Sequence, residues 1–321
     1  MADREIKNSD YFTVAFYNLE NLFDTFDDQY TNDNDFLPKS EKHWTEKRYR
    51  KKIRKLGYAI SRIGRQTAKK HPTIVGLAEV ENKLVIKDLL ESKALKEYNY
   101  RYVHYDSPDE RGIDVALIYD ADVFKVMHSE VFSLNLYDED GNRDYTRDIL
   151  LVKGKLKNEK IYILVNHWPS RHSGEELTEP HRILASNKVL EIIDIIKSKD
   201  SNAKIIVMGD FNDGPYNKSV KQLVNKEDFY NPMESLKSYT RGSVNHRLEW
   251  YLFDQILFST NFFEIKQNSH TFSKANIFDS EFLKQYKGKY KGGPFRTYVG
   301  LKYKGGYSDH FPVYIHLKRI S

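Results

Sequence analysis

Three short runs of consecutive apolar residues constrain the fold of this chain more than any other feature. They occupy residues 74–78, 161–165 and 205–208. A strand with one face in water alternates apolar and polar residues, so an unbroken apolar run indicates a strand that is covered on both faces. Helical patterns lie between these runs, the clearest at 46–63 and 189–196. The chain is therefore predicted to be an α/β protein with its strands inside covering layers.

The composition supports a globular chain and excludes several classes of protein. The 321 residues are 40% hydrophobic and 14% aromatic, which is enough for a sizeable core. This length suits two average domains or one large α/β domain, and no linker argues for two. The absence of cysteine excludes disulfides, thiolate catalysis and cysteine zinc sites.

The sequence contains no signal for a membrane. No run of about eighteen apolar residues is present. The first ten residues are too polar for a secretory signal. The protein is therefore expected to be cytoplasmic, unless a leader has been removed.

Polar side chains follow the run at 205–208 directly, because Asp210 and Asn212 come just after Gly209. In an extended chain, residues two positions apart project in the same direction, and Gly209 lets the backbone turn. In open α/β sheets, ligands bind at the carboxyl ends of the strands. The same residues also suit a simple turn, since Asp and Asn side chains hydrogen-bond their own backbone. Taken alone the segment favours the turn, and the rest of the chain favours a site.

Other apolar segments also end in polar residues. Asn18 follows the predicted strand 12–17, Glu79 follows residue 78, and His167 comes two positions after residue 165. Each has a structural alternative: Asn18 as a cap, Glu79 at the start of the next helix, His167 as a hydrogen-bonded structural residue. The full set of candidates is Asn18, Glu79, Arg111, His167, Asp210, Asn212, Asp254, Asp309 and His310.

Four of these candidates have contexts of their own. Arg111 ends a loop rich in charge, where it can form a surface ion pair or reach an anion. Asp254 lies inside a predicted strand over 250–258, where a carboxylate needs a partner. Asp309 and His310 precede a last apolar strand. Because several strands can place their ends on one rim, we expect the candidates to meet there.

Two segments carry clustered positive charge. Helix 46–63 has an apolar face and a basic face, and residues 284–304 are rich in lysine and tyrosine. A solvated surface explains the basic helix, and contact with a phosphate backbone is the alternative. With the net charge of +5, these segments favour nucleic acid as the partner. The basic face consists of Lys47, Arg48, Arg50, Lys51, Lys52, Arg54 and Lys55.

The chemistry of the candidate side chains narrows the reaction that they could support. Oxygen ligands without cysteine suit magnesium, manganese or calcium rather than zinc. Glu79 with Asp309 or Asn18 would suffice for Mg²⁺, which binds few carboxylates and keeps waters. The two histidines titrate near neutrality, and a carboxylate such as Asp254 can fix the tautomer of one of them. The set matches metal-assisted hydrolysis of phosphate esters.

Seven motifs occur in a characteristic order along the chain. They are Asn-Leu-Glu-Asn-Leu-Phe-Asp, Ala-Glu-Val-Glu-Asn, Arg-Gly-Ile-Asp-Val-Ala, Asn-His-Trp-Pro-Ser-Arg, Met-Gly-Asp-Phe-Asn-Asp, Phe-Asp-Gln-Ile-Leu and Tyr-Ser-Asp-His-Phe-Pro-Val. This order resembles the endonuclease/exonuclease/phosphatase superfamily, the fold of pancreatic deoxyribonuclease and abasic-site endonucleases. The His-Trp-Pro-Ser-Arg variant is similar to a bacterial branch, many of whose members are exported. The resemblance spans about residues 12–318.

The resemblance implies one domain over residues 1–321 and a four-layer α/β/β/α sandwich. Two mixed β-sheets would pack face to face, with helices on the outer faces and the site at one edge. Glu79 would be the principal metal ligand, aided by Asn18 and Asp309, and the metal would be Mg²⁺, Mn²⁺ or Ca²⁺.

The resemblance also implies roles for the remaining candidates. Asp210 would orient or deprotonate the attacking water, and Asn212 would hold that group or a phosphate oxygen. His310 and Asp254 would form a histidine–carboxylate dyad at the scissile phosphate. His167 would stabilise the transition state or assist the leaving oxygen. Which group is the base stays open.

Substrate-binding roles are expected for Asn18 and, on charge and position alone, for Arg111, Trp168 and Arg171. The predicted function is metal-dependent phosphodiester hydrolysis, with DNA or RNA as the substrate. A phosphatase, or a phosphodiesterase for phospholipid headgroups or inositol phosphates, is the alternative on the same site. A noncatalytic nucleic-acid-binding module is the alternative of another class. A serine hydrolase is disfavoured because the sequence has no Gly-x-Ser-x-Gly elbow.

Overall fold

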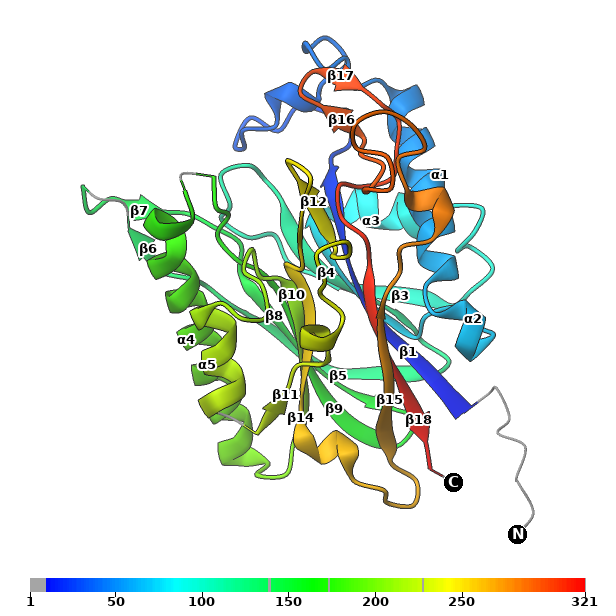
Figure 1. Cartoon of the computed structure of the whole chain (residues 1–321), viewed down its shortest axis with the longest axis vertical. Helices are drawn as coiled ribbons and strands as arrows, with labels where there is room; N and C mark the ends of the chain where they lie inside the picture. Colours follow the sequence, from blue (N-terminus) through cyan, green and yellow to red (C-terminus); the bar gives the residue numbers. More distant parts are fainter. Residues whose placement is uncertain (1–9, 138–139, 173, 227, 321) are drawn as a thin grey trace.

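Two six-stranded β-sheets lie at the centre of the computed structural model, which describes residues 10–137, 140–172, 174–226 and 228–320 (Figure 1). The polar N-terminal segment lies almost entirely outside the described residues. The first sheet has the order β15 (His270–Ile277), β18 (Val313–Arg319), β1 (Tyr11–Leu22), β2 (Ile74–Val80), β4 (Asp114–Asp120) and β3 (Tyr100–His104). The second has the order β11 (Phe229–Tyr230), β14 (Asp254–Ser259), β10 (Lys204–Asp210), β9 (Glu159–His167), β8 (Ile149–Leu156) and β5 (Phe124–Phe132).

Both sheets are mixed. β1 runs parallel to β2, and β9 runs parallel to β10, whereas the other neighbouring strands are antiparallel. β3 and β4 are antiparallel neighbours at one side of the first sheet. The parallel pairs bring strand ends from distant parts of the sequence to the same edge.

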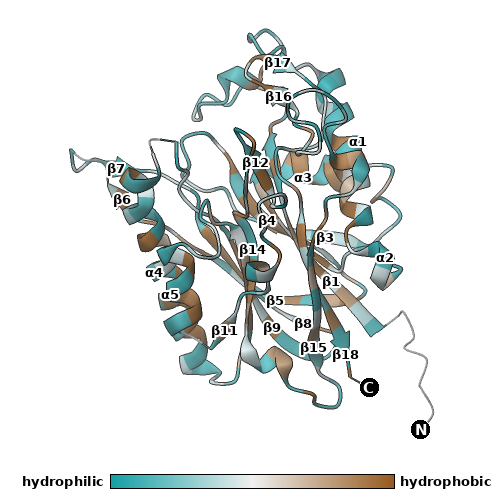
Figure 2. Cartoon of the chain, viewed as in Figure 1, coloured by the Kyte–Doolittle hydropathy of each residue, from teal (hydrophilic) through white to brown (hydrophobic). Residues whose placement is uncertain are grey.

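Helices cover the outer faces of the two sheets and complete four layers (Figure 1). One side carries α1 (Glu46–Arg62), α2 (Arg65–Ala68) and α3 (Lys83–Leu90), and the other carries α4 (Glu175–Lys199) and α5 (Lys218–Lys226). The predicted α/β/β/α sandwich is confirmed. Figure 2 shows hydrophobic residues gathered on the strands in the middle of the molecule.

Alternation along β10 shows why its run is apolar throughout. Ile206 and Met208 belong to the core between the sheets, whereas Ile205 and Val207 belong to the core under α4 and α5. The sheets approach closely at Gly76, where a Cβ atom would lie 2.8 Å from the sulfur of Met208. Both faces of β10 are therefore covered, as the run predicted.

The predicted strand over 250–258 is wrong in its boundaries. β13 (Glu249–Tyr251) pairs with β12 (Val244–His246) in a separate hairpin, and β14 starts at Asp254. Asp254 is therefore the first residue of β14, level with the last residues of β10 and β9. The aromatic run suggested one continuous strand because residues 252 and 253 are also apolar.

The remaining elements are short. The strands are β6 (Leu136–Tyr137), β7 (Arg143–Asp144), β16 (Tyr298–Val299) and β17 (Lys302–Tyr303). The 3₁₀ helices are η2 (Asn34–Phe36), η3 (Pro232–Ser235), η4 (Thr260–Phe263) and η5 (Glu281–Leu283). Among the described residues, no helix has both the length and the apolar character that a membrane crossing requires.

Candidate active site

The pairing of the second sheet places three of the predicted residues in one row. His167 ends β9 beside Asp210 at the end of β10, and Asp210 pairs in turn with Asp254 at the start of β14. Each continues the alternation of side chains that face the first sheet, such as Val165, because strand side chains repeat every second residue. At this end of β9, β10 and β14, an imidazole and two carboxylates therefore face the first sheet.

The first sheet supplies the opposite side of the site. Asn18 lies within β1 and Glu79 within β2, so neither follows its strand as the sequence suggested. The pairing of β1 with β2 is irregular between Asn18 and Leu22, and Glu79 has a left-handed φ of 61°. This bulge turns the Glu79 carboxylate toward the edge, and such strained backbone is typical of functional sites.

Asp210 uses its two oxygens for two purposes. The backbone N–H of Asn212 donates to Oδ1 at 2.9 Å, which is the predicted turn. Nδ2 of Asn18 donates to Oδ2 at 3.0 Å, and this oxygen faces the site. Burial raises the pKa of Asp210 to about 6, while His310 opposes the shift. Asp210 therefore forms the predicted turn with Oδ1 and presents Oδ2 to the site.

Glu79 is held by two donors. Oε2 accepts from the backbone N–H of Asn21 at 2.7 Å, and Oε1 accepts from Nδ2 of Asn18 at 3.3 Å. The alternative role of Glu79 at the next helix start is excluded, since Asn82 caps α3 with its own side chain. The Asn18 amide links the Glu79 and Asp210 carboxylates, while its oxygen accepts from the N–H of Glu20.

His310 and Asp254 form a close pair. Nδ1 of His310 lies 2.7 Å from Oδ2 of Asp254, and the Asp254 side chain is fully buried. Burial alone would lower the pKa of His310, but the carboxylates of Asp254 and Asp210 raise it well above its ordinary value. His310 is therefore a cationic imidazolium at neutral pH, with Nε2 turned to Asp210 at 3.8 Å.

His167 has the opposite electrostatic setting. Burial lowers the pKa of His167 well below its ordinary value, and the nearby cations Arg147 and Arg111 lower it further. Nε2 lies 3.9 Å from Oε1 of Glu79 and 3.8 Å from Oδ2 of Asp210. Its Nδ1 is buried and has no hydrogen-bond partner within the described part of the chain. The two histidines therefore differ in charge, a division typical of acid–base sites.

Asp309 lies at the border of the site, between Arg296 and His310. Nη2 of Arg296 lies 2.9 Å from Oδ2 of Asp309, and Nε2 of His310 lies 3.9 Å from its Oδ1. Burial would raise the pKa of Asp309, but His310 and Arg296 lower it below its ordinary value. The carboxylate is therefore ionised, which suits a cation ligand.

The predicted substrate-binding residues lie in different surroundings. Arg111 is exposed, and its guanidinium donates to Oδ1 of Asn21 at 2.5 Å, beside the Glu79 carboxylate. Trp168 is fully buried against Phe211, with ring centroids 4.4 Å apart. The structure brings Arg111 to the site and places the Trp168 indole in the core. The substrate-binding roles of both stay predictions.

Arg171 and Asn212 lie behind the row of site residues. The Arg171 guanidinium contacts Asp213 and Glu175, each at 2.6 Å. Asn212 has a φ of 48°, and its amide donates to the carbonyl of Trp168 at 2.9 Å. The chain is no longer extended here, so Asn212 does not project parallel to Asp210 as the sequence suggested. Their roles at the substrate also stay predictions.

A glycine is needed at position 209 for a reason other than the predicted turn. It lies within β10, where a Cβ atom would lie 2.3 Å from the carbonyl oxygen of Asn166. The glycine therefore permits close approach of β9 and β10 just before Asp210 and His167.

Sequence reasoning missed a buried cluster beneath Asp309. Lys52 of α1 is buried and donates to the carbonyl of Glu20 and to Oγ1 of Thr297. The Glu20 carboxylate accepts from the N–H of Thr297 at 2.6 Å, and burial raises its pKa to about 7. Lys52 is therefore not part of the solvated basic face. Its spacing from Leu56 on the apolar stripe was a signal, because residues four apart share a helix face.

The donor set fits a hard divalent cation. Glu79 and Asp309 offer carboxylate oxygens, and Asp210, Asp254 and His310 form a group whose ligand atoms lie within 4.8 Å of one another. Around Mg²⁺, bonds of about 2.1 Å put ligand atoms about 3.0 to 4.2 Å apart. Nε2 of the neutral His167 lies 3.9 Å from Oε1 of Glu79 and 3.8 Å from Oδ2 of Asp210, within this range. These residues can surround a cation or a phosphate oxygen, and the individual ligand roles stay predictions.

Comparison with known proteins decides the family. A sequence profile described as Endonuclease/Exonuclease/phosphatase family matches residues 13–319. The chain belongs to this family. Its members are metal-dependent phosphoester hydrolases, so the chain is an enzyme of that class. No protein of curated function matches the sequence.

Solved structures share the fold of this family member at low sequence identity. A Bacteroides thetaiotaomicron endonuclease/exonuclease/phosphatase family protein has a TM-score of 0.61 and 19% identity, over 96% of this chain and 95% of that one. The mannosyl-6-phosphatase Bt3783 of the same species has a TM-score of 0.58 and 20% identity, over 95% and 99%. D. rerio TDP2 complexed with single-strand DNA product has a TM-score of 0.56 and 14% identity, over 96% and 99%. At these identities the likeness concerns the fold alone.

Proposed function

We propose that this protein is a divalent-metal-dependent phosphodiesterase that cleaves nucleic acid. The observation that carries the proposal is the His310–Asp254 pair, at 2.7 Å, on the same sheet edge as Asp210 and Glu79. Such an edge combines a cationic donor, a buried carboxylate of raised pKa and oxygen ligands for a cation. These are the groups that hydrolysis of a phosphate diester requires.

The residues divide the chemistry among them. Oδ2 of Asp210 accepts a proton from the attacking water, and Asn18 holds this oxygen in place. Nε2–H of the His310 imidazolium donates to an oxygen of the phosphate, and Asp254 keeps the ring oriented. Neutral His167 offers a second ring nitrogen beside Asp210.

Glu79 and Asp309 would hold the cation, with the Asn18 amide fixing the Glu79 carboxylate. When bound, Mg²⁺ or Mn²⁺ supplies Lewis-acid stabilisation of the phosphate and leaving oxygens. In the reaction itself, the oxygen of water forms the new P–O bond as its proton passes to Asp210, and the leaving oxygen departs as an alkoxide that takes a proton from solvent.

Nucleic acid is the substrate that the charge distribution favours. The exposed part of the α1 basic face includes Lys47, Lys51 and Arg54, and the protein carries a net charge of +5. Clustered lysine and arginine favour a phosphate backbone. D. rerio TDP2, which shares the fold, has been observed with single-strand DNA product.

A phosphatase is the second candidate, since a mannosyl-6-phosphatase has the same fold. The two candidates differ in the ester that they hydrolyse. A panel of single-stranded and double-stranded DNA, RNA, sugar phosphates, inositol phosphates and phospholipids, each with Mg²⁺, separates them. Cleavage of sugar phosphates without cleavage of any nucleic acid would overturn the proposed substrate.

Activity is expected to require a divalent cation. Treatment with EDTA should reduce oligonucleotide cleavage to background, and added Mg²⁺ or Mn²⁺ should restore it, because the edge collects carboxylates for a hard cation. Gel analysis of labelled oligonucleotides measures both states. Full cleavage in EDTA would contradict the proposed mechanism.

The pH profile should report the ionisation of Asp210. As a base, Asp210 must be deprotonated, and its pKa is raised to about 6. Log kcat/KM should therefore fall as pH decreases through about 6, with a slope of one, since kcat/KM reports groups of the free enzyme. Steady-state kinetics from pH 5 to 8 at constant Mg²⁺ test this. Unchanged kcat/KM down to about pH 5 would exclude Asp210 as the base.

A further inference from the structure

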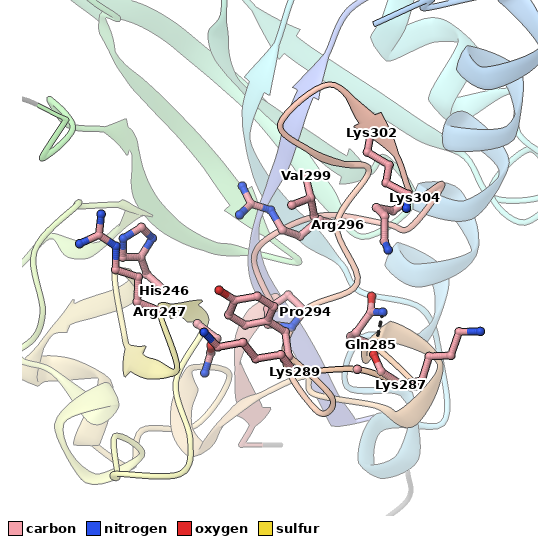
Figure 3. Close-up of a pocket in the computed structure, with 14 residues that line it drawn as sticks. His246, Arg247, Gln285, Lys287, Lys289, Pro294, Arg296, Val299, Lys302 and Lys304 are labelled. Carbon is pink, nitrogen blue, oxygen red and sulfur yellow. Dashed lines mark hydrogen bonds between the residues drawn. The ribbon is translucent and has the colours of Figure 1, made fainter.

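A cavity of about 450 Å³ lies beside the candidate active site (Figure 3). One wall is the turn of the β12–β13 hairpin, and the other consists of the loops between residues 285 and 304. Its volume is in the range of ligand sites, about 300 to 1,000 Å³. The buried Gly293 and Pro294 are among the lining residues. We call this cavity the basic pocket.

The charge of the basic pocket is strongly one-sided. None of the fourteen described residues that line it is acidic, and six are lysine or arginine. Like charges brought together repel, so an unneutralised cluster of this kind favours an anion. The six are Arg247, Lys287, Lys289, Arg296, Lys302 and Lys304.

Five of these six cations are available to a ligand. Arg296 is paired with Asp309, and the other five form no salt bridge with any residue in the described ranges. Arg50, on another part of the surface, is by contrast paired with Glu46 and Asp88. The lining of the basic pocket therefore offers these five cations no carboxylate as a counter-ion.

The pocket is connected to the active site at two points. Arg296 lines the pocket and contacts Asp309 at 2.9 Å. On the other wall, Val244 forms a backbone bridge with His310, and the hairpin continues from Val244 to Arg247. A phosphate at His310 and an anion in the pocket would therefore lie close to each other.

We propose that the basic pocket binds a second phosphate of the substrate whose scissile phosphate lies at His310 and Asp210. This inference rests on the proposed function and deepens it. A substrate with a single phosphate has no group to place in the pocket, so the preferred substrate carries several phosphates along one chain. Tyr290, which also lines the pocket, offers a ring for a neighbouring base.

The test compares substrates that carry one phosphate with substrates that carry several. A dinucleoside monophosphate has one phosphodiester, whereas an octanucleotide has seven. Removing two pocket cations, with K289A/K302A, should raise KM for the octanucleotide about tenfold and lower the salt dependence of log KM by about two. For the dinucleoside monophosphate the change should stay below about twofold. The kcat values should be similar, because these lysines do not contact the reacting atoms.

A matched control removes two exposed lysines from another surface. Lys125 and Lys155 pair across β5 and β8, at the end of the second sheet remote from His167. K125A/K155A changes the net charge by the same amount and should leave KM for both substrates unchanged. Equal effects of the two double variants would show only a loss of general charge, and would overturn the proposal.

A binding measurement separates this proposal from the proposed function. Fluorescence anisotropy of a labelled octanucleotide in EDTA reports binding without cleavage. Weaker binding of K289A/K302A but not of K125A/K155A supports the pocket, even if nucleic acid is not hydrolysed. Inositol hexakisphosphate as a competitor distinguishes a nucleic-acid chain from another polyphosphate. If neither ligand binds the wild-type protein, or the pocket variant binds both as tightly, the proposal fails.

Discussion

Replacement of Glu79 by glutamine is expected to lower kcat/KM by about 10³-fold. The change keeps the shape of the side chain but removes the charge that would hold the cation. A bound metal supplies several kcal/mol of transition-state stabilisation, and each 1.36 kcal/mol is tenfold in rate. Initial rates across a Mg²⁺ titration, with Mg²⁺ affinity from calorimetry, measure the effect.

The fold should tolerate Glu79→Gln. The glutamine oxygen can still accept from the N–H of Asn21, and the left-handed φ of 61° costs glutamine no more than glutamate. Glu81→Gln is the matched control two residues away. Burial raises the pKa of Glu81 to about 8, so its carboxyl is already largely protonated at neutral pH. Comparable loss in both variants, or wild-type activity in Glu79→Gln, would exclude Glu79 as a metal ligand.

The sequence could predict the layers of the fold because burial leaves a direct trace in residue patterns. The run at 205–208 is apolar on both faces, and the structure covers one face with the other sheet and one with helices. The buried stripe of α1, which includes Ile53, Leu56 and Ile60, follows the same logic. The row of His167, Asp210 and Asp254 extends this pattern to the sheet edge.

The details that the sequence could not supply depend on contacts between distant segments. Thr297 hydrogen-bonds both Lys52 and Glu20, and Arg296 forms an ion pair with Asp309. Thr297 and Arg296 lie in a loop segment whose sequence has no periodicity. The start of β14 at Asp254 depends on the β12–β13 hairpin, which local propensity alone does not reveal. Asn18 and Glu79 also lie within their strands, because a bulge and not a strand end turns Glu79 toward the site.

A double-mutant cycle on His310 and Asp254 should show that the two residues act as one unit. His310→Gln is expected to reduce kcat by 10²- to 10⁴-fold, the range for loss of a positioned acid–base group. Asp254→Asn should cost about 10- to 100-fold, because Asp254 acts by orienting His310 and raising its pKa. The double variant should be no slower than His310→Gln alone, since residues that act together are non-additive. Single-turnover rates at saturating substrate measure all four enzymes.

The role of Asp254 as a positioning residue requires a readout that a purely structural role would not change. Asp254 is fully buried, and Oδ2 contacts Nδ1 of His310 at 2.7 Å. In Asp254→Asn the carboxylate charge is lost, so the pKa of the His310 imidazole should fall, and NMR titration of the ¹⁵N-labelled ring measures this shift. Glutamine is used at position 310 instead of alanine because an unpaired buried carboxylate costs about 3–5 kcal/mol of stability. Additive losses in the cycle, or an unchanged His310 titration in Asp254→Asn, would show that the pair does not act as a dyad.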